Sequence, residues 1–133
     1  MARGREPREH RYVAIRILIV DDDAGFLGVA AELLAARGFE VIGRAGDAAQ
    51  ALAATTTDCP DGILLEVNLP GRDGFATATA LAGACPSARI VLTSAEAGPV
   101  AAEVLRGCRA DAFVPKQELA TSDLAQLFRR SDP

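Results

Sequence analysis

Short apolar runs alternate with amphipathic stretches along this chain, and the alternation repeats five times. Each apolar run is rich in aliphatic residues and is bounded by turn-forming residues, which is typical of buried strands. The sequence predicts strands at residues 15–20, 39–42, 63–65, 89–92 and 112–114. It predicts helices at residues 24–37, 48–54, 75–82, 100–106 and within 117–130.

Residues that commonly cap helices lie at the expected helix ends. Asp23, Asp47 and Asp73 each precede an expected helix, and Ser122 is a candidate cap for the last helix. Gly38 follows the first helix, where a glycine often ends helical structure. For Asp23 in particular, capping is a better interpretation than ligand binding.

Five strand–helix units in series call for a parallel sheet that is covered by helices on both faces. Right-handed crossovers leave few topologies, and the strand order 2-1-3-4-5 is the expected one. The sequence therefore predicts a single-domain α/β fold with a doubly wound, five-stranded parallel sheet. We expect this domain to occupy residues 12–131, with residues 1–11 forming a disordered basic tail.

Composition and charge exclude several functions. The chain has 133 residues and a formal net charge of −4, which argues against a general nucleic-acid-binding surface. None of its apolar runs approaches the ~18 residues that a membrane-spanning helix needs. The basic start is followed by only a short apolar run, so it does not resemble a signal peptide. A cytoplasmic protein with no direct contact to membrane or nucleic acid is expected.

The three cysteines, Cys59, Cys85 and Cys108, lie far apart in the sequence and form no CxxC pair. An odd number of separated cysteines argues against a disulfide framework and against a zinc site. We interpret all three as small, buried or half-buried thiols in a reducing cytosol.

Polar residues end four of the five expected strands. The carboxyl ends of parallel strands meet at one edge of an open sheet, which is where ligands bind in this kind of fold. The residues at these ends are Asp21 and Asp22 (first strand), Glu66 (third), Thr93 and Ser94 (fourth), and Lys116 (fifth).

The chemistry of these side chains suits a cation and a phosphoryl group. Three converging carboxylates, Asp21, Asp22 and Glu66, would repel one another unless a cation lay among them. Mg²⁺ prefers such hard oxygen ligands. A hydroxyl group and the Lys116 ammonium opposite them would suit the oxygens of a transferred phosphoryl group.

The segments that carry these residues resemble a response-regulator receiver domain, the phospho-acceptor partner in two-component signalling. The resemblance covers about residues 16–130 and implies the flavodoxin-like, CheY-like (βα)5 fold. The segments that carry it are ILIVDD (17–22), PDGILLEVNLPGRDG (60–74), VLTSA (91–95) and AFVPK (112–116).

The resemblance implies a role for each site residue. Asp21, Asp22 and the residue at position 66 would hold Mg²⁺, together with the backbone carbonyl of Asn68. Thr93 would contact a phosphoryl oxygen, and an alternative alignment gives this role to Ser94. Phe113 would be the aromatic residue that rotates when the domain switches, and Lys116 would pair with the phosphoryl group.

The departure from the family pattern is Glu66, which occupies the position of the phospho-accepting aspartate. Glutamate reaches roughly 1 Å deeper, and a misplacement of about 1 Å can cost ~10²-fold in a positioned reaction. Its charge of about −1 imitates only part of a phosphoryl group, which carries up to about −2. A silent salt bridge between Glu66 and Lys116 is the simplest alternative.

We therefore predict an atypical, non-enzymatic receiver that is not conventionally phosphorylated. It would act through a signalling protein partner, such as a kinase, an output protein or a second copy, at the face around residues 100–128. One alternative is an orthodox phosphorelay receiver that accepts phosphate from a histidine kinase. A more remote alternative is a Mg²⁺-dependent phosphohydrolase, suggested by Asp21 and Asp23, although a later acidic pair is missing.

Overall fold

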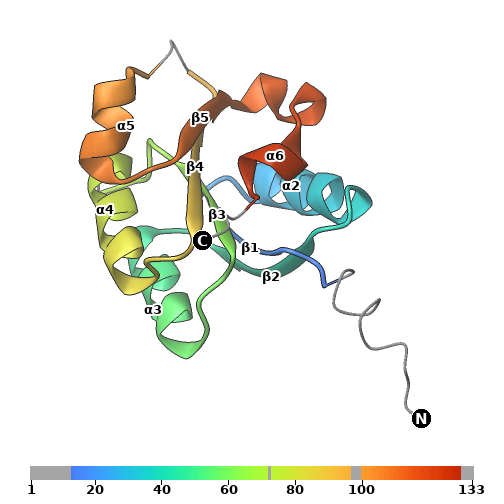
Figure 1. The fold of residues 1–133 in the computed structure, drawn as a ribbon, viewed down its shortest axis with the longest axis horizontal. Helices are drawn as coiled ribbons and strands as arrows, with labels where there is room; N and C mark the ends of the chain where they lie inside the picture. Colours follow the sequence, from blue (N-terminus) through green and yellow to red (C-terminus); the bar gives the residue numbers. More distant parts are fainter. Residues whose placement is uncertain (1–12, 72, 97–99, 130–133) are drawn as a thin grey trace.

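The computed structural model describes residues 13–71, 73–96 and 100–129 and contains a five-stranded parallel sheet (Figure 1). The strand order is β2-β1-β3-β4-β5, as the sequence predicts. The expected tail at residues 1–11 lies outside the described residues. The strands are β1 (Arg16–Val20), β2 (Glu40–Ala45), β3 (Gly62–Glu66), β4 (Arg89–Ser94) and β5 (Ala112–Pro115).

Helices cover both faces of the sheet (Figure 1). On one face, α3, α4 and α5 pack against side chains such as Leu18, Ile63 and Leu92. On the other face, α2 and the C-terminal segment pack against alternating residues such as Ile17 and Ile19. The helices are α2 (Ala24–Ala36), α3 (Ala48–Thr57), α4 (Gly74–Ala84), α5 (Ala102–Cys108), the 3₁₀ helix η1 (Lys116–Thr121) and α6 (Leu124–Leu127).

The predicted aspartate caps are confirmed. The side chain of Asp23 accepts hydrogen bonds from the backbone N–H groups of Gly25 and Phe26 at the start of α2. Asp47 and Asp73 cap α3 and α4 in the same way. Each cap satisfies backbone donors that have no partner within the helix.

The C-terminal segment differs from the single helix that we expected, because it is divided into η1 and α6. The predicted Ser122 cap is wrong: its hydroxyl donates to the carbonyl of Glu118 at 2.7 Å, and Asp123 caps α6 instead. The guanidinium of Arg37 at the end of α2 donates to the carbonyls of Ala120 and Ser122, which ties the break between the two short helices to α2.

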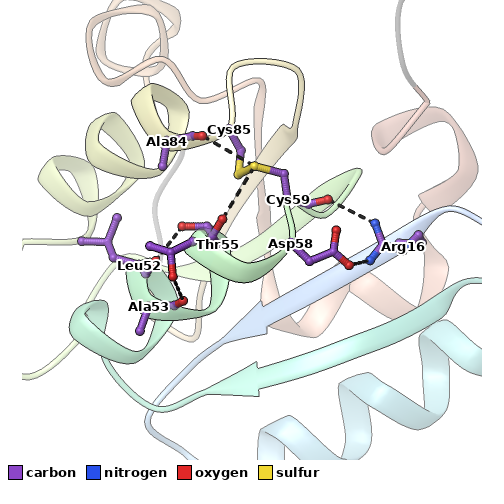
Figure 2. The surroundings of a disulfide bond; sticks show 9 residues. Arg16, Leu52, Ala53, Thr55, Asp58, Cys59, Ala84 and Cys85 are labelled. Carbon is purple, nitrogen blue, oxygen red and sulfur yellow. Dashed lines mark hydrogen bonds and ion pairs between the residues drawn. A yellow bond between two sulfur atoms is a disulfide. The ribbon is translucent and has the colours of Figure 1, made fainter.

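The cysteine prediction is wrong for two of the three residues. Cys59 and Cys85 form a disulfide, with their Cα atoms 5.7 Å apart (Figure 2). Cys59 follows α3 and Cys85 follows α4, so both precede neighbouring strands of the sheet and lie close together despite a separation of 26 residues. The cysteines of this chain therefore give no support for a reducing compartment. Cys108 is buried and free, as predicted.

Among the described residues, none of the helices combines the length and the apolar character that crossing a membrane would require.

Candidate functional site

A pocket of about 220 Å³ lies at the carboxyl edge of the sheet, where the sequence places the polar strand ends. The loops after β1, β3 and β4 form it, together with the start of η1 after β5. The residues that line it are Asp21, Asp22, Asp23, Glu66, Asn68, Ser94, Ala95, Glu96 and Lys116.

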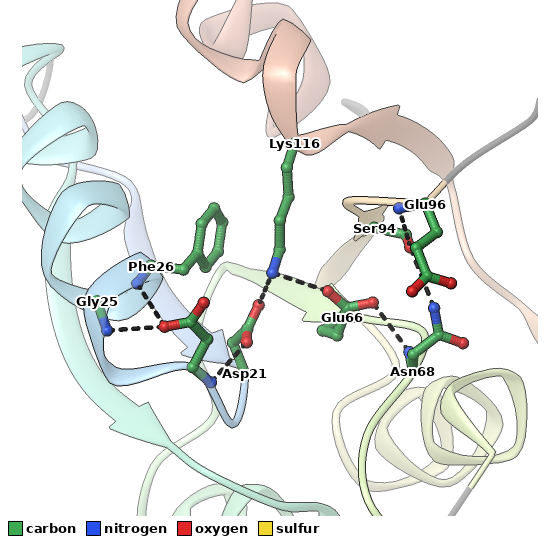
Figure 3. A network of polar contacts seen from close by, with 9 residues as sticks. Asp21, Gly25, Phe26, Glu66, Asn68, Ser94, Glu96 and Lys116 are labelled. Carbon is green, nitrogen blue, oxygen red and sulfur yellow. Dashed lines mark hydrogen bonds and ion pairs between the residues drawn. The ribbon is translucent and has the colours of Figure 1, made fainter.

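An ionic network of three side chains joins β1, β3 and the start of η1 across this pocket (Figure 3). The Lys116 Nζ lies 2.8 Å from Asp21 Oδ2 and 2.9 Å from Glu66 Oε1. The side chains of Asp21 and Glu66 are only 1% and 6% exposed, and that of Lys116 is 16% exposed. The single ammonium therefore neutralises only one of two buried negative charges.

The other oxygens of the two carboxylates are also bonded. Asp21 Oδ1 accepts a hydrogen bond from the Asp23 N–H at 2.8 Å. Glu66 Oε2 accepts a hydrogen bond from the Asn68 N–H at 2.9 Å. Because a carboxylate needs several donors when it is buried, these bonds stabilise the charged forms and fix the orientation of both side chains.

Phe26 is a member of the site that the sequence did not indicate. The Nζ of Lys116 lies 4.2 Å from the centroid of its ring, a cation–π geometry. Phe26 lies in the helix that the sequence predicts at residues 24–37, and its position there indicates no more than a packing function. Its ring covers the lysine from the α2 side (Figure 3).

The network shifts the pKa of two groups. Burial raises the pKa of the Asp21 carboxyl, and this effect outweighs the lowering by its bonds to Lys116 and to the Asp23 N–H. Burial by itself would lower the pKa of Lys116, but the hydrogen bonds and negative charges of Asp21 and Glu66 raise it, and the net direction is upward. Lys116 is therefore held in its charged form.

The two hydroxyl candidates lie in different surroundings. Ser94 lines the pocket, and its Oγ accepts hydrogen bonds from the Asn68 Nδ2 at 3.2 Å and the Glu96 N–H at 3.1 Å. Thr93 pairs with Glu66 in the β3–β4 ladder and is completely buried. Within the described residues its hydroxyl has no hydrogen-bond partner. The structure thus brings Ser94, and not Thr93, to the pocket.

The remaining candidates are divided between the pocket and the core. Asp22 lies at the pocket and is exposed, while Asp23 uses its carboxylate to cap α2. Phe113 is half-buried on β5, where it packs against the apolar cluster beneath α4 and α5, and it does not line the pocket. Asn68 contributes its N–H and its side-chain amide, two contacts that the sequence did not suggest.

In this structure the acidic side chains are arranged around the Lys116 ammonium. The oxygens of Asp21 and Glu66 that face each other share the Lys116 ammonium, which supplies the positive charge that a cation would supply. Within the described part of the chain, no three histidine, cysteine or acidic side chains are grouped so that they could hold a metal ion. The positive charge at the centre of the site is therefore that of a side chain, Lys116.

The fold and the pocket define a class of protein: a doubly wound domain that gathers acidic residues, a hydroxyl and a lysine at the carboxyl edge of its sheet. Residues 17–129 match the response regulator receiver domain family, and the chain belongs to that family. It is thus a receiver domain of the kind that operates in two-component signalling.

Two curated relatives and one solved structure illustrate the similarity. The transcriptional regulatory protein PdtaR of Mycobacterium tuberculosis is 34% identical over 79 residues, which cover 59% of this chain and 38% of PdtaR. The chemotaxis protein CheY of Bacillus subtilis is 34% identical over 83 residues, which cover 62% of this chain and 69% of CheY. A response regulator from Burkholderia pseudomallei, solved with a phosphorylated aspartic acid, a calcium ion and citrate, is 26% identical.

The Burkholderia structure superposes with a TM-score of 0.75, over 85% of this chain and 66% of that one. The chain spans only 28–38% of the length of the first curated relatives that it matches. These relatives therefore support the receiver assignment, and the activities of their other parts do not carry over.

Proposed function

We propose that this chain is an atypical receiver that signals through protein–protein contacts and is not conventionally phosphorylated. One observation carries the proposal: the carboxylate of Glu66, at the acceptor position, is already bonded to the Lys116 ammonium and to the Asn68 N–H. The groups that would hold an incoming phosphoryl group are thus engaged by the side chain that would have to accept it.

Phosphorylation of Glu66 would require several of these contacts to break at once. The Glu66 side chain is 6% exposed, so a phosphoryl donor reaches its oxygens only after the ion pair with Lys116 opens. That opening would leave the buried Glu66 carboxylate without its counter-charge. A buried charge that loses its partner is strongly destabilised, so the conformation in which Glu66 could accept a phosphoryl group is rarely populated.

Glu66 also sets the electrostatic state of the site permanently. Its carboxylate supplies about one negative charge, whereas a phosphoryl group would supply up to about two and three acceptor oxygens. A receiver with this site keeps one charge state regardless of the phosphate supply. Its conformational equilibrium then responds to a binding partner that prefers one conformation, as population-shift thermodynamics requires.

Receiver domains interact with kinases and output proteins, and we assign the contact face of this chain to residues 100–128. This region contains α5, β5, η1 and α6, and Val104 on α5 is 45% exposed. We place the interaction in the cytoplasm. Within the pocket we assign the hydroxyl role to Ser94, because it lines the pocket and Thr93 does not.

The test is intact-mass spectrometry after incubation with acetyl phosphate and Mg²⁺. The proteins are the wild type, Glu66→Asp, and Glu96→Asp as a matched control that shortens another carboxylate of the same pocket. We expect one phosphoryl adduct on Glu66→Asp and none on the wild type or on Glu96→Asp. Aspartate withdraws the carboxylate from Lys116 and restores the side-chain length of the family acceptor.

A stable adduct on the wild type would overturn the proposal and would support the orthodox phosphorelay alternative. If Glu66→Asp also stays unmodified while it remains folded, the loss of phosphorylation has causes beyond one methylene group, and our explanation by Glu66 is wrong.

A further inference from the structure

We propose that Cys59 and Cys85 form a reversible thiol–disulfide exchange site for a low-molecular-weight thiol. The bond lies at the amino-terminal edge of the sheet, because its two residues precede β3 and β4. The polar pocket lies at the opposite edge. The exchange site is therefore separate from the receiver site, and the inference does not depend on the fate of Glu66.

The two cysteine residues differ in exposure. Cys59 is an exposed residue in the short connection between α3 and β3, whereas Cys85 at the end of α4 is 1% exposed. Thiol exchange requires the attacking thiolate to reach a disulfide sulfur along an open approach. Attack is therefore directed to the Sγ of Cys59, and Cys85 is the buried leaving group.

The Cys59 connection is held in place without the disulfide (Figure 2). The Arg16 guanidinium donates to the carbonyl of Cys59 at 3.1 Å and pairs with the Asp58 carboxylate. The Arg16 N–H donates to the Asp61 carboxylate at 2.8 Å, and the Asp61 N–H donates to the Arg16 carbonyl at 2.8 Å. These bonds tie the connection to β1, so cutting the disulfide does not release it.

The Cys85 end is held in a similar way. The Cys85 N–H donates to the Leu81 carbonyl at 2.8 Å, and the Cys85 carbonyl accepts from the Ala88 N–H at 3.0 Å. Because both backbones keep their positions, the two thiols of a reduced protein remain neighbours. Proximity of this kind raises the effective concentration of one thiol at the other and favours closure of the bond.

The surroundings also suit the reduced form. The Cys59 Sγ lies 3.5 Å from the Ala84 carbonyl oxygen and 3.9 Å from the Thr55 carbonyl oxygen (Figure 2). A disulfide sulfur has no proton to donate, but a Cys59 thiol would have two acceptors within reach. Both redox states can therefore be accommodated without rearrangement of the backbone.

The exchange is a two-step reaction with a thiol, such as glutathione, as the reductant. A thiolate attacks the Cys59 Sγ, the bond between the cysteines breaks, and Cys85 leaves as a thiolate that takes up a proton. A second thiolate attacks the thiol-derived sulfur of the mixed disulfide and releases Cys59 as a thiolate, which is also protonated. In total, two thiols are oxidised to one disulfide and the protein disulfide is reduced by two electrons.

The bond restrains the part of the chain that carries Glu66. The covalent loop from Cys59 to Cys85 contains the whole of β3 and α4. Opening it removes a link between the end of α3 and the end of α4 while the hydrogen bonds at either end remain. The redox state thus changes the constraint on these helices and leaves the fold intact.

The test uses the full chain in glutathione buffers of stepwise increasing ratio of reduced to oxidised form. Samples are quenched under native conditions with iodoacetamide and analysed by intact mass, with far-ultraviolet circular dichroism on the same samples. We expect no alkylation of the oxidised protein and one rapid alkylation, at Cys59, after reduction. Returning the protein to oxidised glutathione before quenching should restore a mass lower by two hydrogens and abolish alkylation.

Two variants make the assignment specific. Cys108→Ser should behave as the wild type, because Cys108 is buried and free. Cys85→Ser removes the partner, so Cys59 should be rapidly alkylated in reduced glutathione and should instead carry a mixed disulfide with glutathione, without alkylation, in oxidised glutathione. The proposal is overturned if glutathione fails to reduce the bond and only a dithiol in denaturant succeeds, if reduction abolishes the circular dichroism signal, or if the three thiols stay reduced in oxidised glutathione.

Discussion

At the level of single residues, the site holds three charged side chains in a small buried space. Asp21 and Glu66 carry two negative charges, and Lys116 supplies one positive charge between them. The ring of Phe26 covers the ammonium. Since the two carboxylates are almost fully buried, Lys116 is the residue on which the stability of the arrangement depends most directly.

Replacing this lysine should therefore be costly. Lys116→Met would leave two buried carboxylates without a counter-charge, and removal of one partner of a buried ion pair costs about 3–5 kcal/mol. We expect a loss of this order in the free energy of unfolding at pH 7, measured by urea denaturation. Gln117→Met, at the exposed neighbouring position, is the matched control and should change stability little. Equal effects of the two substitutions would contradict the counter-charge argument.

The same ion pairs predict a pH dependence with a defined sign. The pKa of Lys116 is raised above its ordinary value of 10.5 in the folded state. The folded protein therefore holds this proton more tightly than the unfolded chain, so stability falls as the pH rises through the folded-state pKa. The stability difference between the wild type and Lys116→Met should be complete between pH 7 and pH 10.5 and should shrink above pH 10.5. A difference that grows with alkaline pH would refute this.

The meeting of Asp21, Glu66 and Lys116 could be predicted from the sequence, because the carboxyl ends of parallel strands share one edge. The choice between Thr93 and Ser94 could not, since a shift of one residue decides which side chain lines the pocket. Phe26 could not be assigned to the site either, because its spacing in α2 is the same as that of a core residue.

At the level of helices and strands, the loop from β3 to α4 fixes where Glu66 lies. Val67 and Asn68 follow Glu66, and α4 begins at Gly74, which packs directly on the backbone of Val67. A Cβ at Gly74 would lie 2.4 Å from the Val67 Cα and carbonyl oxygen. The close approach of the two backbones therefore requires glycine at this position.

Gly74→Ala should consequently strain the loop beside Glu66. Overpacking of this kind costs about 1–3 kcal/mol, and the contact here is with backbone, which cannot rotate away. Gly83→Ala is the matched control, because Gly83 lies in the same helix and a Cβ there meets nothing within 4 Å. That control should stabilise the protein by about 0.5–1 kcal/mol through its better helix propensity. Thermal unfolding of both variants gives the comparison. If Gly74→Ala were more stable than the wild type, the loop would have moved to make room for the methyl group, and the overpacking argument would be wrong.

At the level of the whole molecule, the sequence predicted the strand order but missed the disulfide. The predicted order places β3 beside β4, and Cys59 and Cys85 precede these two strands. The proximity of the two connections was thus implicit in the predicted topology. The sequence could not show the direction of the two side chains. The number and spacing of the cysteines do not indicate such a contact in the folded chain.

Reduction of this disulfide should lower the stability of the entire domain. Closing a loop with a separation of 26 residues restricts the unfolded chain, and the chain-entropy relation gives a contribution of about 3–4 kcal/mol. We expect a loss of that order in the free energy of unfolding between the oxidised and the reduced wild type, measured by urea denaturation. The Cys59→Ser/Cys85→Ser variant should match the reduced wild type and should not respond to reductant.

A domain of this size commonly has about 5–15 kcal/mol of stability, so the reduced protein should remain folded with a lower denaturation midpoint. Cys108→Ser controls for any effect of the reductant on the free thiol. Equal stability of the reduced and oxidised proteins would contradict this prediction. The hydrogen bonds around Arg16 and Cys85 form only when β1 and α4 are in place, so they cannot restrict the unfolded chain as the disulfide does.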